Sequence, residues 1–177
     1  MSEQVKNAAI QQVNISYVSI EDRLLLRIGI ANQSELSVWL TRRIAKKLAF
    51  VLHDTPISVP TDPRVNSPYT QDLEQRFAKE EMLQKLNFSS DYEQRSSLNS
   101  GQIFLVSDCR IVEPNNQHRV LELLCSNQQT VSVALNDELL LAVMNMLQLA
   151  SQQAEWDFAS TEQTLLAGSS NMNTLLH

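Results

Sequence analysis

One pattern constrains the fold of this 177-residue chain most: three short runs with apolar residues at every second position, followed by a helix with an N-cap residue. The pattern occurs twice. Successive side chains of a strand point to opposite faces, so apolar residues at every second position predict strands with one buried face. The first half shows this pattern in QQVNISYVSI, DRLLLRIGI and ELSVWL. The expected fold is therefore α+β, with short turns between strands and a helix after the third.

A helix is expected directly after the third run. Thr41 is a suitable N-cap because its hydroxyl can accept a hydrogen bond from a free N–H of the first turn. Apolar residues then recur at helical spacing until about Asp54, and Pro56 and Pro60 prevent the helix from continuing. Residues 1–55 are thus predicted to form a strand–strand–strand–helix unit.

The same order is predicted in the second half, from GQIFLVSDCRIV, HRVLELLC and TVSVAL followed by a helix whose N-cap is Asn136. Aligning LSVWLTRRIAKKLAFVL with VSVALNDELLLAVMNML matches Thr41 with Asn136, and the residues before them also correspond. Residues 102–153 are therefore interpreted as a second, related unit, which implies an internal duplication. We expect residues 56–101 to be a Pro-rich and helical connector and residues 154–177 to be a mobile C-terminal tail.

Two segments carry a resemblance to a known family. EDRLLLRI, followed by a short turn and VWLTRRIAKKL, is similar to the opening of a bacterial protein family with a DRLLLR and WLTRR pattern, over residues 21–48. This resemblance implies a bacterial origin, and it implies no function because the family has no activity known to us. The repeated layout also resembles the Whirly class of single-stranded nucleic-acid binders, which have four strands per repeat where three are expected here.

The predicted first helix carries a cationic arc with Phe50 in its middle, opposite the apolar side. Cations in the first turn of a helix interact unfavourably with the helix dipole and destabilise the helix by about 0.3 to 1 kcal/mol each. Helix stability alone therefore does not explain why they are present. Residues 1–55 carry seven Lys and Arg against five Asp and Glu, whereas residues 102–177 carry two against eight. An aromatic among cations suits a stacked base or an acidic, apolar partner. The alternative is a solvated face with Phe50 tucked under the connector.

Trp39, Arg23 and Arg27 are expected on the strand face opposite the core. A Trp beside arginines can be a stacking platform, or it can be a cation–π patch that seals the open side of a small sheet, and the sequence leaves both interpretations open. The predicted binding surface consists of Arg23, Arg27, Trp39, Arg42, Arg43, Lys46, Lys47 and Phe50.

The predicted second helix is apolar nearly all round. Leu141, Met144 and Leu149 lie largely outside its core-facing stripe, which centres on Val143 and Leu147. A monomer rarely exposes so much apolar surface. Either the sheet and the connector cover both sides of the helix, or the three residues form the interface of a homodimer, the commonest closed assembly.

The residue types give catalysis little support. His53, His118 and His177 have no metal-binding spacing, and three glycines leave no phosphate-binding loop. Cys109 lies in a predicted strand, where a small buried hydrophobic role is expected. We therefore predict no catalytic residue, no metal site and no cofactor.

Net charge and the absence of targeting signals exclude further classes of protein. A formal net charge of -6 argues against a protein dedicated to duplex DNA. The N-terminus has no basic region followed by an apolar run, and no segment has the length to span a bilayer, so we expect a cytoplasmic protein without a membrane partner. The sequence favours a non-catalytic binding or assembly module that presents a basic, aromatic-containing surface to an acidic partner. The alternative is a single-stranded nucleic-acid-binding protein.

Overall fold

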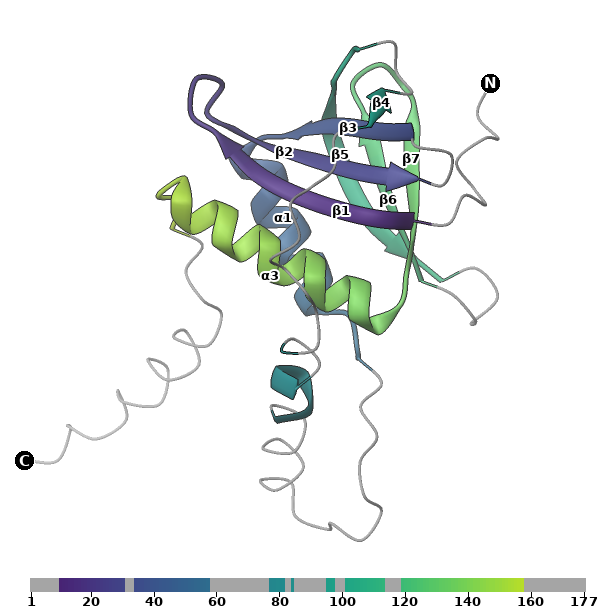
Figure 1. The fold of residues 1–177 in the computed structure, drawn as a ribbon, viewed down its shortest axis with the longest axis vertical. Helices are drawn as coiled ribbons and strands as arrows, with labels where there is room; N and C mark the ends of the chain where they lie inside the picture. Colours follow the sequence, from purple (N-terminus) through teal and green to yellow (C-terminus); the bar gives the residue numbers. More distant parts are fainter. Residues whose placement is uncertain are drawn as a thin grey trace, which may run out of the picture.

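The computed structural model describes residues 10–30, 34–57, 77–81, 84, 95–97, 101–113 and 119–157. They form a seven-stranded sheet with two long helices against it (Figure 1). The order across the sheet is β1-β2-β3-β5-β6-β7, and β4 adds to β3 beside this path. The expected α+β class is confirmed.

The six longer strands are those predicted from the alternating runs. Their bounds are β1 Ile10–Val18, β2 Arg23–Ile30, β3 Ser34–Leu40, β5 Phe104–Val112, β6 Arg119–Cys125 and β7 Thr130–Leu135. Each half is an antiparallel meander, and the halves join where β3 and β5 run parallel, with Val38 opposite Phe104 and Trp39 opposite Leu105. The even-numbered residues Leu24, Leu26 and Val38 face the core, as their alternation predicts.

The connector contributes a strand that the sequence did not predict. β4 (Ser96–Ser97) runs parallel to β3 at Ser34 and Glu35, and it lies within residues 56–101, which were expected to be a Pro-rich and helical connector. Beside it, the Arg95 guanidinium donates to the Ile30 carbonyl at 2.9 Å. The expected connector helix is seen at residues 77–81, and the rest of its predicted span lies outside the described residues except position 84.

Both helices begin at the predicted caps. α1 (Arg42–His53) follows Thr41, whose hydroxyl accepts from the Ile44 N–H at 3.4 Å. α3 (Asp137–Gln153) follows Asn136, whose side-chain oxygen accepts from the Leu139 N–H at 2.7 Å. These bonds satisfy backbone donors that helix starts leave free.

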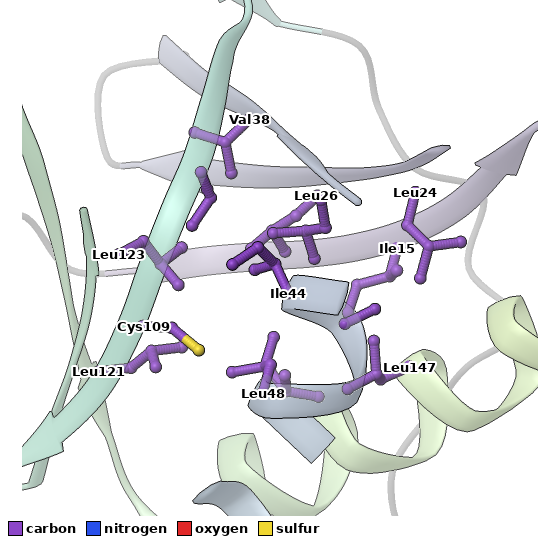
Figure 2. Packing of buried hydrophobic residues seen from close by; sticks show 14 of the residues in the cluster. Ile15, Leu24, Leu26, Val38, Ile44, Leu48, Cys109, Leu121, Leu123 and Leu147 are labelled. Carbon is purple, nitrogen blue, oxygen red and sulfur yellow. The ribbon is translucent and has the colours of Figure 1, made fainter. Parts of the chain in front are cut away.

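Each helix packs chiefly on the half of the sheet that it does not follow. α1 lies mainly against β5 and α3 mainly against β1, and the two helices also contact each other. Figure 2 shows Ile44 and Leu48 of α1 among side chains of both halves, with Leu147 of α3 close by. The two strand–helix units therefore share one hydrophobic core.

The ordered structure continues past the end of α3. The Trp156 N–H donates to the Ser151 carbonyl at 2.9 Å, and Glu155 has a positive φ of 54°. This geometry is typical of a helix that ends in a left-handed residue. Trp156 is buried and meets Tyr17 edge-on, with ring centroids 6.0 Å apart. The second unit is thus longer than the expected 102–153, and residues 158–177 of the predicted tail lie outside the described residues.

Candidate binding surface

The outer side of α1 carries the predicted cations around an exposed aromatic ring. Four exposed cations and Phe50 form what we call the cationic face: Arg42, Arg43, Lys46, Lys47 and Phe50. The Phe50 side chain is 66% exposed, so no segment that the structure describes covers it. Lys47 and Lys46 stand three and four positions before Phe50, which makes them its neighbours on the helix surface.

This face forms because the apolar residues of α1 occupy the other side. Ile44, Leu48 and Leu52 are fully buried and fix the rotation of the helix against the core. With a helical period of 3.6 residues, Phe50 then falls near the centre of the exposed arc. Core packing therefore determines the direction of the cationic face.

Charge on the cationic face is only partly neutralised. The Lys47 ammonium pairs with the Asp108 carboxylate of β5. The hydrogen bond from Lys47, followed by one from the Cys109 N–H at 2.8 Å, holds the pKa of Asp108 below its usual value, and the nearby Arg43 charge acts in the same direction. Arg42, Arg43 and Lys46 form no ion pair within the described part of the chain. These three charges leave this side of the helix positive.

The three strand residues of the predicted surface lie on the other side of the sheet. Leu25 is opposite Trp39 and Arg27 opposite Ser37, which confirms the predicted pleat. That face is turned away from the core in which α1 packs. The sheet therefore separates Arg23, Arg27 and Trp39 from the cationic face, so the eight residues predicted for binding do not form one continuous surface.

These strand cations are also engaged locally. Arg27 lies 4.0 Å from the Glu35 carboxylate, which accepts from the Ser37 hydroxyl at 2.7 Å. Glu35 is only 7% exposed. Arg23 lies 3.8 Å from Glu21. The face is a largely buried polar layer, and the half-buried Trp39 helps to close it.

Glu35 was missed by sequence reasoning although the alternation contains a signal. It shares the strand parity of Ser37 and Trp39 and lies opposite Gly29. A Cβ at Gly29 would stand 3.3 Å from the Arg95 guanidinium, so glycine leaves room for that side chain. An acid and an arginine at positions of one parity on adjacent strands predict a cross-strand pair.

The residues predicted for a dimer interface have three different environments. Leu141 is 4% exposed and Met144 packs partly against the core, whereas Leu149 is 55% exposed. The expectation that Leu141 offers surface to a second subunit is wrong. α3 contacts β1, α1 and β7, so its buried arc is wider than one stripe.

Other candidate chemistry is sparse in the part of the chain that the structure describes. There, no three His, Cys, Asp or Glu residues are grouped to hold a metal ion. His53 is exposed, and His118 and His177 lie outside the described residues. Cys109 is buried, as predicted, and this burial raises its pKa to about 11. None of the described helices has both the length and the apolar run needed to cross a bilayer.

No protein-family model matches the chain, and searches of curated proteins and of solved structures found no match either. The functional argument therefore depends on the chain's own residues. Its strongest element is the cationic face of α1.

Proposed function

We propose that the protein is a cytoplasmic binding or assembly module without catalytic activity, and that the cationic face of α1 receives an acidic partner. The observation that carries this proposal is a set of three cations around the exposed Phe50, none of which forms an ion pair with a residue that the structure describes: Arg42, Arg43 and Lys46. They lie on a chain whose formal net charge is -6, so they are a local concentration and not a general excess.

The cations stand where they weaken the isolated helix. α1 has no acidic residue in its first turn, and Arg42 and Arg43 occupy the first two helical positions. Each opposes the helix dipole by about 0.3 to 1 kcal/mol. An anionic partner reverses the sign of this effect, because its charge is attracted both by the arginines and by the helix N-terminus. Selection for binding explains an arrangement that stability alone disfavours.

Phe50 gives the surface an apolar centre. Burying such a side chain stabilises a complex by about 1.5 to 3 kcal/mol, whereas leaving it exposed contributes nothing. A buried aromatic surrounded by cations has the organisation of an interface hot spot with a polar rim. α1 has 12 residues and is about 18 Å long, which matches an apolar groove with acidic walls on a partner protein.

Single-stranded nucleic acid is the second candidate. Phe50 offers a face on which a base can stack, and the neighbouring cations suit phosphates. Such proteins normally align several aromatics along one groove. Trp39 is on the other side of the sheet, so Phe50 lacks that second platform, and this favours the protein partner.

A fluorescence anisotropy titration tests the two candidates. The probes are a labelled amphipathic peptide with Glu on one face and Leu on the other, and a labelled oligothymidylate, each at low and moderate salt. We expect the peptide to bind more tightly, with an affinity that falls as salt rises. Tighter binding of the oligothymidylate with a steep salt dependence would favour nucleic acid. Absence of binding to both probes at low salt would contradict the proposal.

Single variants localise the interaction. Phe50→Ala is expected to weaken peptide binding about 30-fold, as for a central aromatic anchor. Lys46→Gln should weaken it less and reduce its salt dependence. Arg110→Gln is the matched control because Arg110 is also an exposed cation but pairs with Glu122 on the strands. Equal losses for Lys46→Gln and Arg110→Gln would mean that net charge, and not the cationic face, determines binding.

We further propose that the two units arose by internal duplication. The proposal is supported by their shared order of three antiparallel strands and a helix, and by Thr41 and Asn136 at equivalent helix starts. Superposing residues 13–54 on 103–150 should align both caps together with all three strands. Agreement of the helices without the strands would count against duplication.

We also propose that the chain forms a symmetric homodimer. Because Leu141 is buried within the subunit, it does not support a dimer through α3. The support comes instead from the two ends of the sheet, where β1 and β7 are the edge strands among the described ones. Open edges favour pairing with another chain. Light scattering of the full chain should give twice the monomer mass, and a monomer at the highest soluble concentration would end this proposal.

A further inference from the structure

Among the strands that the structure describes, β7 is an edge strand without the usual protection. It pairs with β6 on one side and with no described strand on the other. Its sequence, TVSVAL, has no charge and no proline, and its register with β6 is regular. Soluble proteins normally guard such edges with charges, prolines or bulges. β1, at the other end of the sheet, has a register irregularity between Ile10 and Gln12.

The preceding turn determines which backbone groups of β7 face outward. The Cys125 N–H donates to the Gln129 carbonyl at 2.8 Å, so these residues are a hydrogen-bonded pair at the end of the hairpin. Hydrogen-bonded pairs alternate along an antiparallel ladder. The backbone groups that bond to β6 are therefore those of Val131, Val133 and Leu135. The backbone N–H and C=O groups that point to the open side are those of Thr130, Ser132 and Ala134.

The side chains along this edge are small and uncharged. Val131, Val133 and Leu135 face the core, whereas Thr130 and Ala134 are exposed and Ser132 is half-buried on the other face. A two-fold axis at Ser132 places Ser132 opposite its own equivalent and Thr130 opposite Ala134. These three pairs would exchange about six backbone hydrogen bonds. Along the open side of β7, none of the described side chains is both outward-facing and bulky or charged.

The flanks of β7 are also compatible with self-pairing. Asp137 and Glu138 follow the strand, whereas the amides of Asn127 and Gln128 precede it. In the two-fold register the acids of one copy lie beside the amide-rich turn of the other, so carboxylates do not meet. Asp137 is in addition held by Arg119, whose guanidinium donates to it at 2.6 Å. Like charges directly opposite each other would have been destabilising.

We infer that two copies of this chain pair through β7, antiparallel and centred on Ser132, so that their sheets become one continuous sheet. This inference rests on the homodimer proposed above and names its surface. It is independent of the cationic face, because that face belongs to α1 and the inferred interface belongs to β7. A strand from another protein, or the chain's own C-terminal segment, would be a competing occupant of the edge.

Edge variants of the full chain test the inference by light scattering. Ser132→Pro removes an outward N–H while the bonds to β6 remain, because proline is tolerated where the N–H faces away from the ladder. Ser132→Lys places two like charges opposite each other in the dimer. Both are expected to weaken dimerisation at least about 100-fold. Ser132→Thr, which keeps the N–H and the strand propensity, and Ser16→Lys on β1 should leave the dimer intact.

Cross-linking reads the register directly. A short bifunctional maleimide should link Ser132→Cys into a covalent dimer and leave Ser16→Cys monomeric. The native Cys109 and Cys125 are 1% and 4% exposed, so they give little background.

Each outcome has a definite meaning. A monomeric parent overturns both the dimer and the β7 interface and points to another occupant of the edge. A dimer that survives Ser132→Pro and Ser132→Lys, or that is linked through Ser16→Cys, overturns the β7 interface and leaves the dimer standing. If Ser132→Pro loses its circular dichroism signal, Ser132→Lys, which leaves the backbone unchanged, decides the result. Peptide binding by the cationic face is measured on the same samples and fails or succeeds separately.

Discussion

Replacing Arg42 with Glu should stabilise the fold and at the same time weaken binding of an acidic partner. Arg42 is the first residue of α1, is exposed, and forms no ion pair with any described residue. Its removal therefore breaks no ion pair within the described residues. The substitution separates the two roles of the helix start, since the dipole favours an anion there and the proposed function requires a cation.

The expected gain follows from two terms. Removing the cation and adding an anion at the helix N-terminus are each worth about 0.3 to 1 kcal/mol. Lys46 stands four residues later, so a like-charge pair becomes a Glu–Lys pair, a change of about 0.4 to 1 kcal/mol. Allowing for exposure and salt, we expect a net gain of about 1 to 2 kcal/mol. For a domain of this size, the melting temperature should rise by about 2 to 8 °C.

Thermal unfolding at low and high salt measures this gain, and the peptide titration is repeated on the same samples. The rise in melting temperature should shrink at high salt, because the charges are at the surface. Arg43→Glu is the matched comparison in the same turn. Its gain should be smaller, since the Arg43 charge lies close enough to Asp108 to affect its pKa and a new carboxylate there would repel it. An Arg42→Glu variant less stable than the parent, or one that binds the peptide as well as the parent, would refute this reasoning.

Four further predictions concern stability and reactivity. Asn136→Ala should cost about 1 to 2 kcal/mol and Thr41→Ala about half as much, because the first cap bond is 2.7 Å and the second 3.4 Å; equal losses in urea unfolding would contradict this. Leu48→Ala should cost about 2 to 5 kcal/mol in the same assay, and a loss below 1 kcal/mol, about that of an exposed site, would mean that Leu48 is not in the core. The Cys109 thiol should react with a disulfide reagent at pH 8 only as fast as the protein unfolds, since burial raises its pKa to about 11; rapid labelling of the folded protein would exclude this environment. The pKa of Asp108 is lowered in the folded protein, so its carboxylate stabilises the fold at neutral pH, and this stabilisation is lost as the pH falls through that pKa. The Asp108→Asn variant should therefore lose less stability on acidification than the parent. Identical plots of unfolding free energy against pH for the two proteins would contradict the pairing with Lys47.

Local patterns predicted most elements because local chemistry determines them. The alternation in DRLLLRIGI requires a strand with Leu24 and Leu26 on one face, and Thr41 and Asn136 are recognisable caps from their side chains alone. β4 escaped prediction because two serines carry no periodicity. Their pairing depends on where Arg95 and β3 meet in space.

The candidate surface was predicted in part for the same reason. The helical period placed Phe50 among cations correctly, since both lie on one element. Whether Trp39 lies beside these residues depends on which face of the sheet α1 packs against. Tertiary packing determines that, and the local sequence pattern does not contain it. Leu141 shows the same limit, because its burial results from α3 meeting several neighbours at once.

The crosswise packing of the helices has a consequence for synthesis on the ribosome. α1 is complete at His53, but β5, its main neighbour, begins only at Phe104. About 50 residues must still be added, which takes about 3 to 10 s at ordinary elongation rates. Throughout that interval Ile44, Leu48 and Leu52 lack the surface that buries them in the finished protein. We therefore expect the nascent first half to bind chaperones, and translation pauses before residue 112 should increase its aggregation.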